Sequence, residues 1–138
     1  MHYDDSRAPL VVVTSTGEAS NEEFDAYLER MTTLLRQGQR YGVILDARSS
    51  ARPTPLQRQK QADWMKHNAS AIRTHNVGIA FVIDSAIVRG ALTAILWLHQ
   101  TPSPHKVFAT TDMAESWVAE LLQREGLRVP PVRGRRSL

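Results

Sequence analysis

The stretch YGVILDARSS, residues 41–50, decides the fold of this chain. From Val43 to Leu45 its residues are apolar, without the alternation of polar and apolar positions that marks a strand with one face in water. A run of this kind is typical of a strand that other elements cover on both faces. We therefore expect residues 41–50 to form a buried strand of an α/β sheet.

Three further segments have the composition of strands, and turn residues bound them. They are PLVVVTSTG (9–17), VGIAFVID (77–84) and HKVFATT (105–111). A segment with helical periodicity follows each strand. Strands that alternate with helices imply a parallel sheet with right-handed crossovers. The sequence therefore predicts an α/β fold of four βα units, with a mostly parallel four-stranded sheet and helices packed on it.

Cap signals indicate where the helices begin. Ser20 is followed three positions later by Glu23, and Thr54 is followed in the same way by Gln57. Both pairs have the pattern of a capping box, in which each residue satisfies a backbone N–H of the other. Asp112 is the expected cap of the last helix.

The second expected helix has a polar start and a later apolar side. It opens with LQRQKQ (56–61), and its apolar residues Met65, Ala69 and Ile72 follow within one continuous helix. Trp64 lies about 100° around the helix from Met65, at the edge of the buried stripe. The polar run and Trp64 form a basic and aromatic face, which would either meet a partner or, as is commoner, simply be solvated.

The helix expected over residues 86–99 is almost entirely apolar, with Arg89 as its one charge. A soluble helix normally shows water a polar face, so more than one neighbour has to cover this one. One neighbour is the sheet, and the other is an adjacent helix, a second copy of the protein or an apolar ligand. Arg89 either buries its aliphatic part and keeps its guanidinium in water, or pairs with a carboxylate or an anionic ligand. Arg89 and Trp97 are therefore candidate ligand or partner contacts.

Composition limits the classes of function. The length of 138 residues fits one domain, and the lack of cysteine excludes disulfides and thiolate metal sites and fits a reducing cytoplasm. We expect no signal peptide and no transmembrane segment, because the N-terminal residues are polar and the apolar runs are short. The five histidines are scattered, so the sequence indicates no metal site.

The net charge of +3 comes from the C-terminal residues. Residues 127–138 carry four arginines and no acid, whereas residues 1–126 are close to neutral. A near-neutral body argues against a nucleic-acid-binding domain. We therefore expect a single domain over residues 1–126 and a flexible basic tail over residues 127–138, which would make weak contacts with anionic partners by charge alone.

Polar side chains gather where the expected strands end, which is where ligands bind in open parallel sheets. The candidates for ligand or partner binding there are Asp46, Arg48, Ser49, Ser50, Asp84 and Ser85. Asp46 and Asp84 approach each other if their strands are neighbours, and such a pair would serve acid–base catalysis if its pKa values differ. The alternative is structural: Asp84 caps a helix, and Asp46 holds Arg48 or the N–H groups of a loop.

Three stretches together resemble the SpoIIAA-like, or STAS-like, domain family over residues 9–124. They are VILDARSS (43–50), SAIVRGALTAILWL (85–98) and VFATTDMAESWVAELL (107–122), set in four βα units. The resemblance implies a superhelix of βα units, no cofactor and usually no enzymatic activity. Some members of the family are anti-sigma-factor antagonists, which carry a phosphorylatable serine at the start of a helix.

The equivalent of the antagonists' serine loop is DARSSARPTP, residues 46–55. Its hydroxyls, and so the phosphorylation candidates, are Ser49, Ser50 and Thr54. The Asp-Ser dipeptide followed by glycines that the antagonists carry is absent from this loop, and the dipeptide at residues 84–85 follows a different strand.

The first hypothesis is a non-enzymatic, cytoplasmic STAS-like regulatory or interaction module that binds a protein partner, with a homodimer through residues 86–99 as one form. It predicts a flat apolar patch and no enclosed cavity. The second is a carrier or sensor of a small apolar or amphipathic, lipid-like ligand, which predicts a closed apolar pocket with Arg89 or a strand-end hydroxyl at its mouth. The third is an acid–base enzyme, which predicts that Asp46 and Asp84 converge in a cleft.

Overall fold

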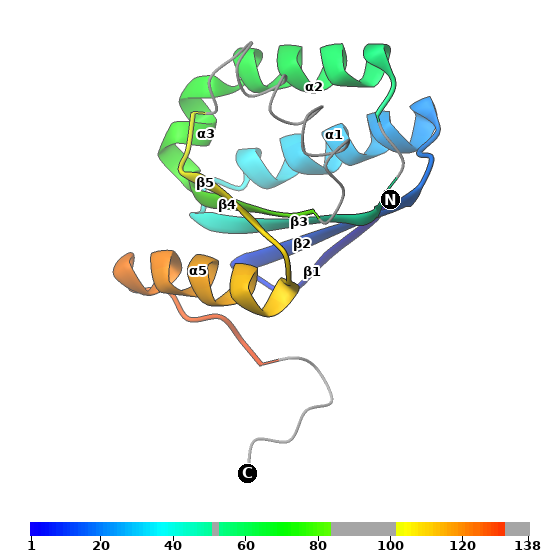
Figure 1. Ribbon diagram of the computed structural model, residues 1–138. Coiled ribbons are helices and arrows are strands. Elements are labelled where there is room, and N and C mark those ends of the chain that lie inside the picture. The colour runs from blue at the N-terminus through cyan, green and yellow to red at the C-terminus, as the bar shows by residue number, and fades with distance from the viewer. Residues whose placement is uncertain (51–52, 84–101, 132–138) are drawn as a thin grey trace.

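The computed structural model describes residues 1–50, 53–83 and 102–131, which form an α/β fold around one sheet (Figure 1). Within these residues the sheet has five strands in the order β1-β2-β3-β4-β5. The strands are β1 (His2–Arg7), β2 (Leu10–Gly17), β3 (Tyr41–Ser50), β4 (Asn76–Val82) and β5 (His105–Phe108). Strands β2 to β5 are parallel to one another and correspond to the four strands that the sequence predicts.

The sheet is mixed, which corrects the prediction of a mostly parallel four-stranded sheet. β1 pairs with β2 in the antiparallel direction, so that Tyr3 lies opposite Val13. The sequence of β1, HYDDSR, has no apolar run, because an edge strand needs backbone hydrogen bonds and not burial on both faces. Charges on such an edge also oppose pairing with another chain. The polar N-terminal residues are therefore part of the sheet.

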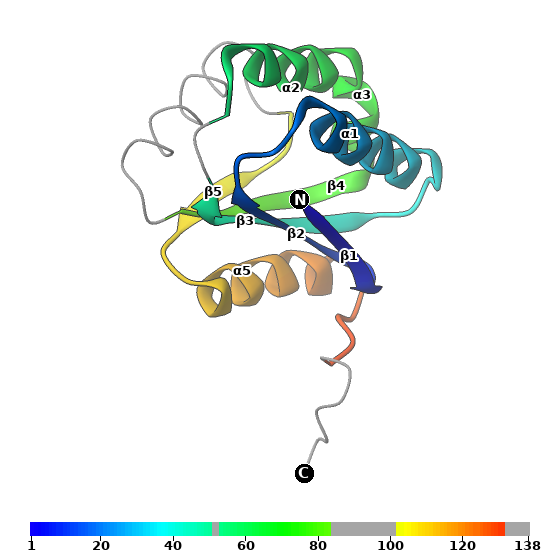
Figure 2. The ribbon, with the colours of Figure 1, turned by 90° about the vertical axis from the view of Figure 1, so that its right-hand side faces the viewer.

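Helices cover both faces of this sheet. α1 (Asn21–Arg36), α2 (Pro55–His67) and α3 (Ala69–His75) lie over one face, which we call the α1–α3 face. α5 (Thr111–Arg124) lies over the other, which we call the α5 face. Figure 2 shows the same two layers from the side. Cover on both faces explains why the centre of β3 has no polar side.

The predicted capping boxes of α1 and α2 are both confirmed. The Ser20 hydroxyl accepts the Glu23 N–H at 3.0 Å, and the Thr54 hydroxyl accepts the Gln57 N–H at 3.1 Å. In return, the Glu23 and Gln57 side chains accept the N–H of their cap residues. Because these boxes follow β2 and β3 directly, the two helices begin at the same edge of the sheet, where the parallel strands end.

Two helix boundaries differ from the prediction. Thr110, not Asp112, caps α5: its hydroxyl accepts the Met113 N–H at 3.3 Å, while Asp112 is exposed in the first turn, where its charge suits the helix dipole. The continuous second helix is wrong, because Asn68 separates α2 from α3. The Asn68 side-chain amide donates to the Trp64 carbonyl at 2.9 Å, and such local side-chain bonds compete with helix continuation.

Alternate strand residues contribute to two separate cores. On the α1–α3 face, Tyr41 and Val43 of β3 pack with the apolar side of α1. On the α5 face, Ile44 of β3 and Ala80 of β4 pack with the apolar side of α5. Since successive strand residues point to opposite faces, the unbroken apolar run of β3 supplies both cores.

α5 packs closely on its face because the two strands beneath it carry glycines. Gly42 of β3 and Gly78 of β4 are partners in the parallel register. A Cβ on Gly42 would collide with Val118 of α5, and a Cβ on Gly78 would lie 2.5 Å from Leu121 Cδ1. The missing side chains therefore allow the helix to lie directly on the strands.

Part of the expected tail packs on the domain. Leu127 and Val129 lie against the core of the α5 face, and the Pro130 carbonyl accepts the Arg7 Nε–H at 2.9 Å. Arg7 also forms an ion pair with Glu115. Residues 51–52, 84–101 and 132–138 lie outside the described residues. The division of the chain at residue 126 and the helix over residues 86–99 therefore stay predictions.

Candidate functional site

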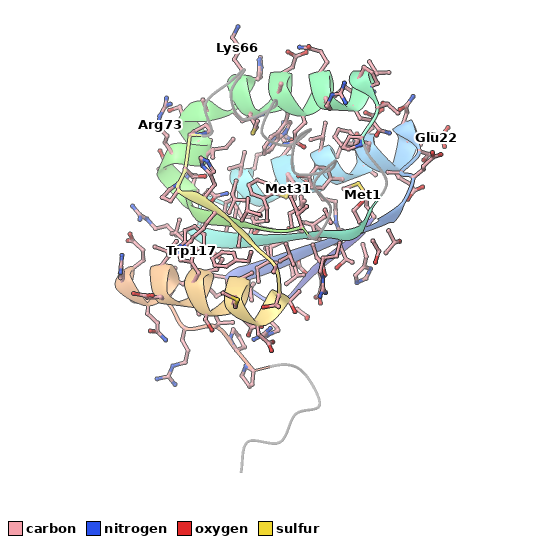
Figure 3. The ribbon with its side chains drawn as sticks, in the orientation of Figure 1. Met1, Glu22, Met31, Lys66, Arg73 and Trp117 are labelled. Atoms are coloured by element: carbon pink, nitrogen blue, oxygen red, sulfur yellow. The ribbon has the colours of Figure 1, made fainter. Side chains whose placement is uncertain are left out.

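A cavity of about 230 Å³ lies between the sheet and the helices of the α1–α3 face. Its wall is mainly apolar, since it is built by strand residues that point to this face and by the inner sides of the helices. Apolar members of the wall include Met31, Val43, Leu45, Ala47, Ile79 and Phe81. Figure 3 shows Met31 in the space between the helices and the sheet.

One end of the cavity lies where the parallel strands end. Ser15 near the end of β2 lines it, together with Gln57 and Arg58 near the start of α2. The Gln57 side chain donates to the Ala19 carbonyl at 2.8 Å, and so ties α2 to the loop before α1. The Arg58 guanidinium donates to the Pro53 carbonyl at 3.3 Å. The cavity thus has a strand-end hydroxyl on its wall, as the carrier hypothesis predicts.

The other end of the cavity holds a buried phenol. Tyr41, the first residue of β3, is 2% exposed and lines the cavity beside Asn76, the first residue of β4. Its hydroxyl makes no hydrogen bond of good geometry with any described residue. Burial raises the pKa of Tyr41 to about 12, and a smaller effect of Asn76 opposes the rise. Tyr41 is therefore a neutral hydrogen-bond donor at physiological pH.

Trp64 faces α1 and not the solvent. Its Nε1–H donates to the Thr32 hydroxyl at 3.0 Å, and the half-buried side chain lines the cavity. The sequence indicates an exposed face formed by Trp64 with the polar run 56–61, but Gln57 and Arg58 of that run line the cavity together with Trp64. Lys60 of that run pairs with Asp25 on the outside of α1 at 2.8 Å. Trp64 therefore belongs to the wall of the cavity.

Asp46 points away from the cavity. Its neighbours Leu45 and Ala47 line the cavity, and successive strand residues point to opposite faces. Arg48 donates to both carboxylate oxygens of Asp46, from Nε at 3.0 Å and from Nη2 at 2.9 Å. These hydrogen bonds hold the pKa of Asp46 below its ordinary value. The structural alternative, in which Asp46 holds Arg48, is therefore confirmed.

Three of the remaining predicted residues lie in the described part of the chain, between the end of β3 and the start of α2. Ser49 is exposed near the end of β3, and Ser50 is the register partner of Gly17 in β2. The Thr54 hydroxyl accepts a backbone N–H as the cap of α2, so its phosphorylation would change that cap. Four predicted residues lie outside the described residues: Asp84, Ser85, Arg89 and Trp97. The approach of Asp84 to Asp46 stays a prediction, although β3 and β4 are neighbours.

Sequence reasoning misses Tyr41 and Asn76 as site residues. Both stand at the beginnings of strands, whereas ligands of open parallel sheets are expected at the strand ends. A signal is nevertheless present, because each residue carries a polar group at the start of an otherwise apolar strand. Strands that are parallel neighbours bring two such residues together at one edge of the sheet.

The described wall of the cavity offers apolar surface together with hydroxyl, phenol, amide and guanidinium groups. Across residues 1–50, 53–83 and 102–131, no three histidine, aspartate or glutamate side chains are grouped as metal ligands. None of the helices in these ranges combines the length and the apolar character needed to cross a bilayer.

No family model and no curated protein matches the chain. Among solved structures, the chain is similar to an uncharacterized protein of the DUF3478 family from Shewanella loihica PV-4, which has a SpoIIAA-like fold. The TM-score is 0.56 at 15% sequence identity, over 79% of this chain and 83% of that protein. A likeness at this identity bears on the fold alone. The chain, with its parallel strands between two helical layers, has the SpoIIAA-like, STAS-like fold that its sequence resembles.

Proposed function

We propose that this chain is a non-enzymatic STAS-like module of the cytoplasm that carries or senses a small apolar or amphipathic molecule. The observation that carries the proposal is the cavity, with its apolar wall and its polar groups at two ends. Small-molecule sites are typically concave and mostly apolar, with a few polar groups that orient the ligand. The lack of cysteine supports the cytoplasm, since it fits a reducing compartment.

The size of the cavity limits the size of the ligand. An apolar cavity of roughly 150 Å³ binds benzene. In proportion, a cavity of about 230 Å³ holds a molecule of roughly ten non-hydrogen atoms. The proposed ligand is therefore a medium-chain or single-ring compound and not a whole membrane lipid.

The state of Asp46 supports binding over acid–base catalysis. A general acid or base works best when its pKa lies near the operating pH. The hydrogen bonds from Arg48 shift the pKa of Asp46 in the opposite direction, to a lower value. Its side chain also points away from the cavity that would hold a substrate.

A protein-binding, regulatory role is the second candidate function. Leu56 at the start of α2 is 51% exposed, and Met113 near the start of α5 is 57% exposed. Both helices follow the carboxyl ends of parallel strands, so these two apolar side chains lie toward the same edge of the sheet. Exposed apolar groups at one edge support a partner contact, but two separate side chains carry less weight than a cavity. The homodimer through residues 86–99 stays a prediction.

Native mass spectrometry of gently purified protein tests both candidates. We expect a mass in excess of the chain, which denaturation removes and whose fragments identify the ligand. In Ala47→Leu, the larger side chain fills part of the cavity, so the excess mass should disappear. Ala26→Leu is the matched control, because Ala26 is exposed on α1, and it should keep the ligand.

Two other results would contradict the carrier or sensor role or favour the protein-binding role. A wild-type chain without excess mass, which also takes up none of an added excess of a nine-carbon aromatic compound, contradicts the carrier or sensor role. A dimer of bare chains, dissociated by Leu56→Ser or Met113→Ser, would instead support the protein-binding role.

A further inference from the structure

The hydroxyl of Tyr41 is a polar group that the described part of the cavity leaves unsatisfied. It is buried, it belongs to a side chain that lines the cavity, and it makes no hydrogen bond of good geometry with any described residue. A buried polar group without a partner costs about 1–3 kcal/mol. Such a group is normally retained where something else supplies the partner.

The neighbouring polar groups are already engaged. The Asn76 Oδ1 accepts the Gly78 N–H at 2.8 Å. The Tyr27 hydroxyl interacts with the Gln61 side chain. The Tyr41 phenol is therefore a buried hydroxyl on the cavity wall whose proton can be donated to a molecule inside the cavity.

The surroundings of Tyr41 also indicate the charge of that molecule. The groups that act on Tyr41 are Asn76 and Tyr3, and no cation of the described residues is among them. Arg58, the guanidinium on the wall, lies toward the opposite end, near the start of α2. Met1 also lines the cavity, and its N-terminal ammonium is paired with Glu23 near the start of α1 at 2.9 Å. An anionic group beside Tyr41 would therefore be buried without a counter-charge, which is far more costly than burying a neutral acceptor.

We infer that the cavity selects an uncharged ligand whose single hydrogen-bond acceptor, such as a ketone, aldehyde or ester carbonyl, accepts the Tyr41 O–H while its apolar body fills the rest of the cavity. This inference rests on the proposed function, because it assigns a ligand class to the same cavity. Tyr41 is then the residue that determines specificity, and the apolar wall supplies the affinity that is common to all ligands.

Three nine-carbon probes test the inference by isothermal titration calorimetry: propylbenzene, propiophenone and 3-phenylpropionate. They share an apolar ring and chain and differ in carrying no acceptor, a neutral carbonyl or a carboxylate. We expect propiophenone to bind roughly fivefold to tenfold more tightly than propylbenzene, as one neutral hydrogen bond provides. We expect 3-phenylpropionate to bind most weakly.

Tyr41→Phe removes the hydroxyl and keeps the ring. In this variant the ratio of the propylbenzene and propiophenone dissociation constants should fall to about one, while both probes still bind. Circular dichroism and the melting temperature report whether the variant is folded, and a variant that has lost a buried unsatisfied hydroxyl should melt no lower than the wild type.

The other outcomes separate this inference from the proposed function. Equal affinities for propylbenzene and propiophenone in the wild type would mean that water satisfies the Tyr41 hydroxyl, and would overturn the inference alone. A preference for 3-phenylpropionate that Arg58→Gln abolishes would place the polar group at the other end of the cavity and also overturn it. Failure of all three probes to bind would overturn both the inference and the proposed function.

Discussion

The two faces of the same sheet are packed in different ways. On the α5 face, Gly42 and Gly78 let the helix lie directly on β3 and β4. On the α1–α3 face, the same two strands carry Tyr41 and Phe81, and the helices above them leave a cavity of about 230 Å³. The strands are shared, so the difference comes from the side chains that point to each face.

The difference shows how one sheet combines a closely packed side with a side that has room for a ligand. Protein interiors are normally as dense as organic crystals, and a helix on a glycine surface reaches that density easily. On the opposite face, large side chains such as Phe81 stand beside the small Ala47. A helix cannot follow so uneven a surface, and the space that remains is the cavity.

The largest expected effect comes from adding a side chain beneath α5. In Gly42→Val the new side chain would collide with Val118, which is fully buried and stiff, so we expect a loss of about 3 kcal/mol in the free energy of unfolding. Ala47→Leu enlarges a side chain of the same strand on the opposite face, toward the cavity, and we expect a change between zero and a gain of about 1 kcal/mol.

Urea denaturation of the two variants measures this contrast. Valine is a better strand former than glycine, so a loss in Gly42→Val can be assigned to the collision. Similar losses in the two variants would show that both faces are packed alike, and would remove the basis of the comparison.

The second prediction concerns the loss of stability at alkaline pH, which the tyrosines of the α1–α3 face should cause. All three tyrosines of the chain, Tyr3, Tyr27 and Tyr41, pack in the core of the α1–α3 face, and burial raises the pKa of each. The unfolded chain releases these protons near pH 10, whereas the folded chain holds them to a higher pH. The stabilisation is therefore complete below about pH 10 and is lost as the pH rises through the folded pKa values.

For Tyr41 alone, with its pKa of about 12, the loss between pH 10 and pH 12 is on the order of 2 kcal/mol. Urea denaturation at a series of alkaline pH values measures the loss, and Tyr41→Phe should make the dependence on pH less steep. Identical slopes for the variant and the wild type would show that Tyr41 titrates normally in the folded chain.

The smallest effect is expected at Asp46, which lies outside the cavity. Asp46→Asn removes the paired charge from Arg48, and we expect a loss of less than about 1 kcal/mol, because Arg48 is partly exposed to solvent. Since the folded pKa of Asp46 is lowered, its stabilisation is present above about pH 4 and is lost as the pH falls further. The variant and the wild type should therefore converge in acid.

Ligand binding provides the second readout for Asp46→Asn. The affinity for propiophenone should not change, because the side chain points away from the cavity. A loss of binding in this variant would show that Asp46 contributes to ligand binding, and that binding is not confined to the α1–α3 face.

Local sequence was sufficient for the parallel strands and for the first two helix starts. The apolar run of β3 and the capping boxes at Ser20 and Thr54 depend on residues a few positions apart, so their signals are visible in the sequence. β1 was not predictable in this way, because an edge strand is held by the backbone of β2 and its polar side chains carry no strand pattern.

The cavity could not be predicted from local sequence either. Tyr41, Ser15, Gln57 and Trp64 come from three different elements, β3, β2 and α2, and their distances from one another are set only when the helices pack on the sheet. Of the strand-end candidates that the sequence offered, Asp46 points to the other face, and Ser15 near the end of β2 lines the cavity instead.

Arg7 has a consequence for the order in which the molecule is completed during synthesis. Its partners Glu115 and Pro130 follow it by 108 and 123 residues. Because the N-terminus leaves the ribosome first, Arg7 of β1 cannot contact both partners until nearly all of the described chain has emerged. The strand that is made first is therefore among the last to gain all its native contacts, and a nascent chain cut short before residue 115 would lack them.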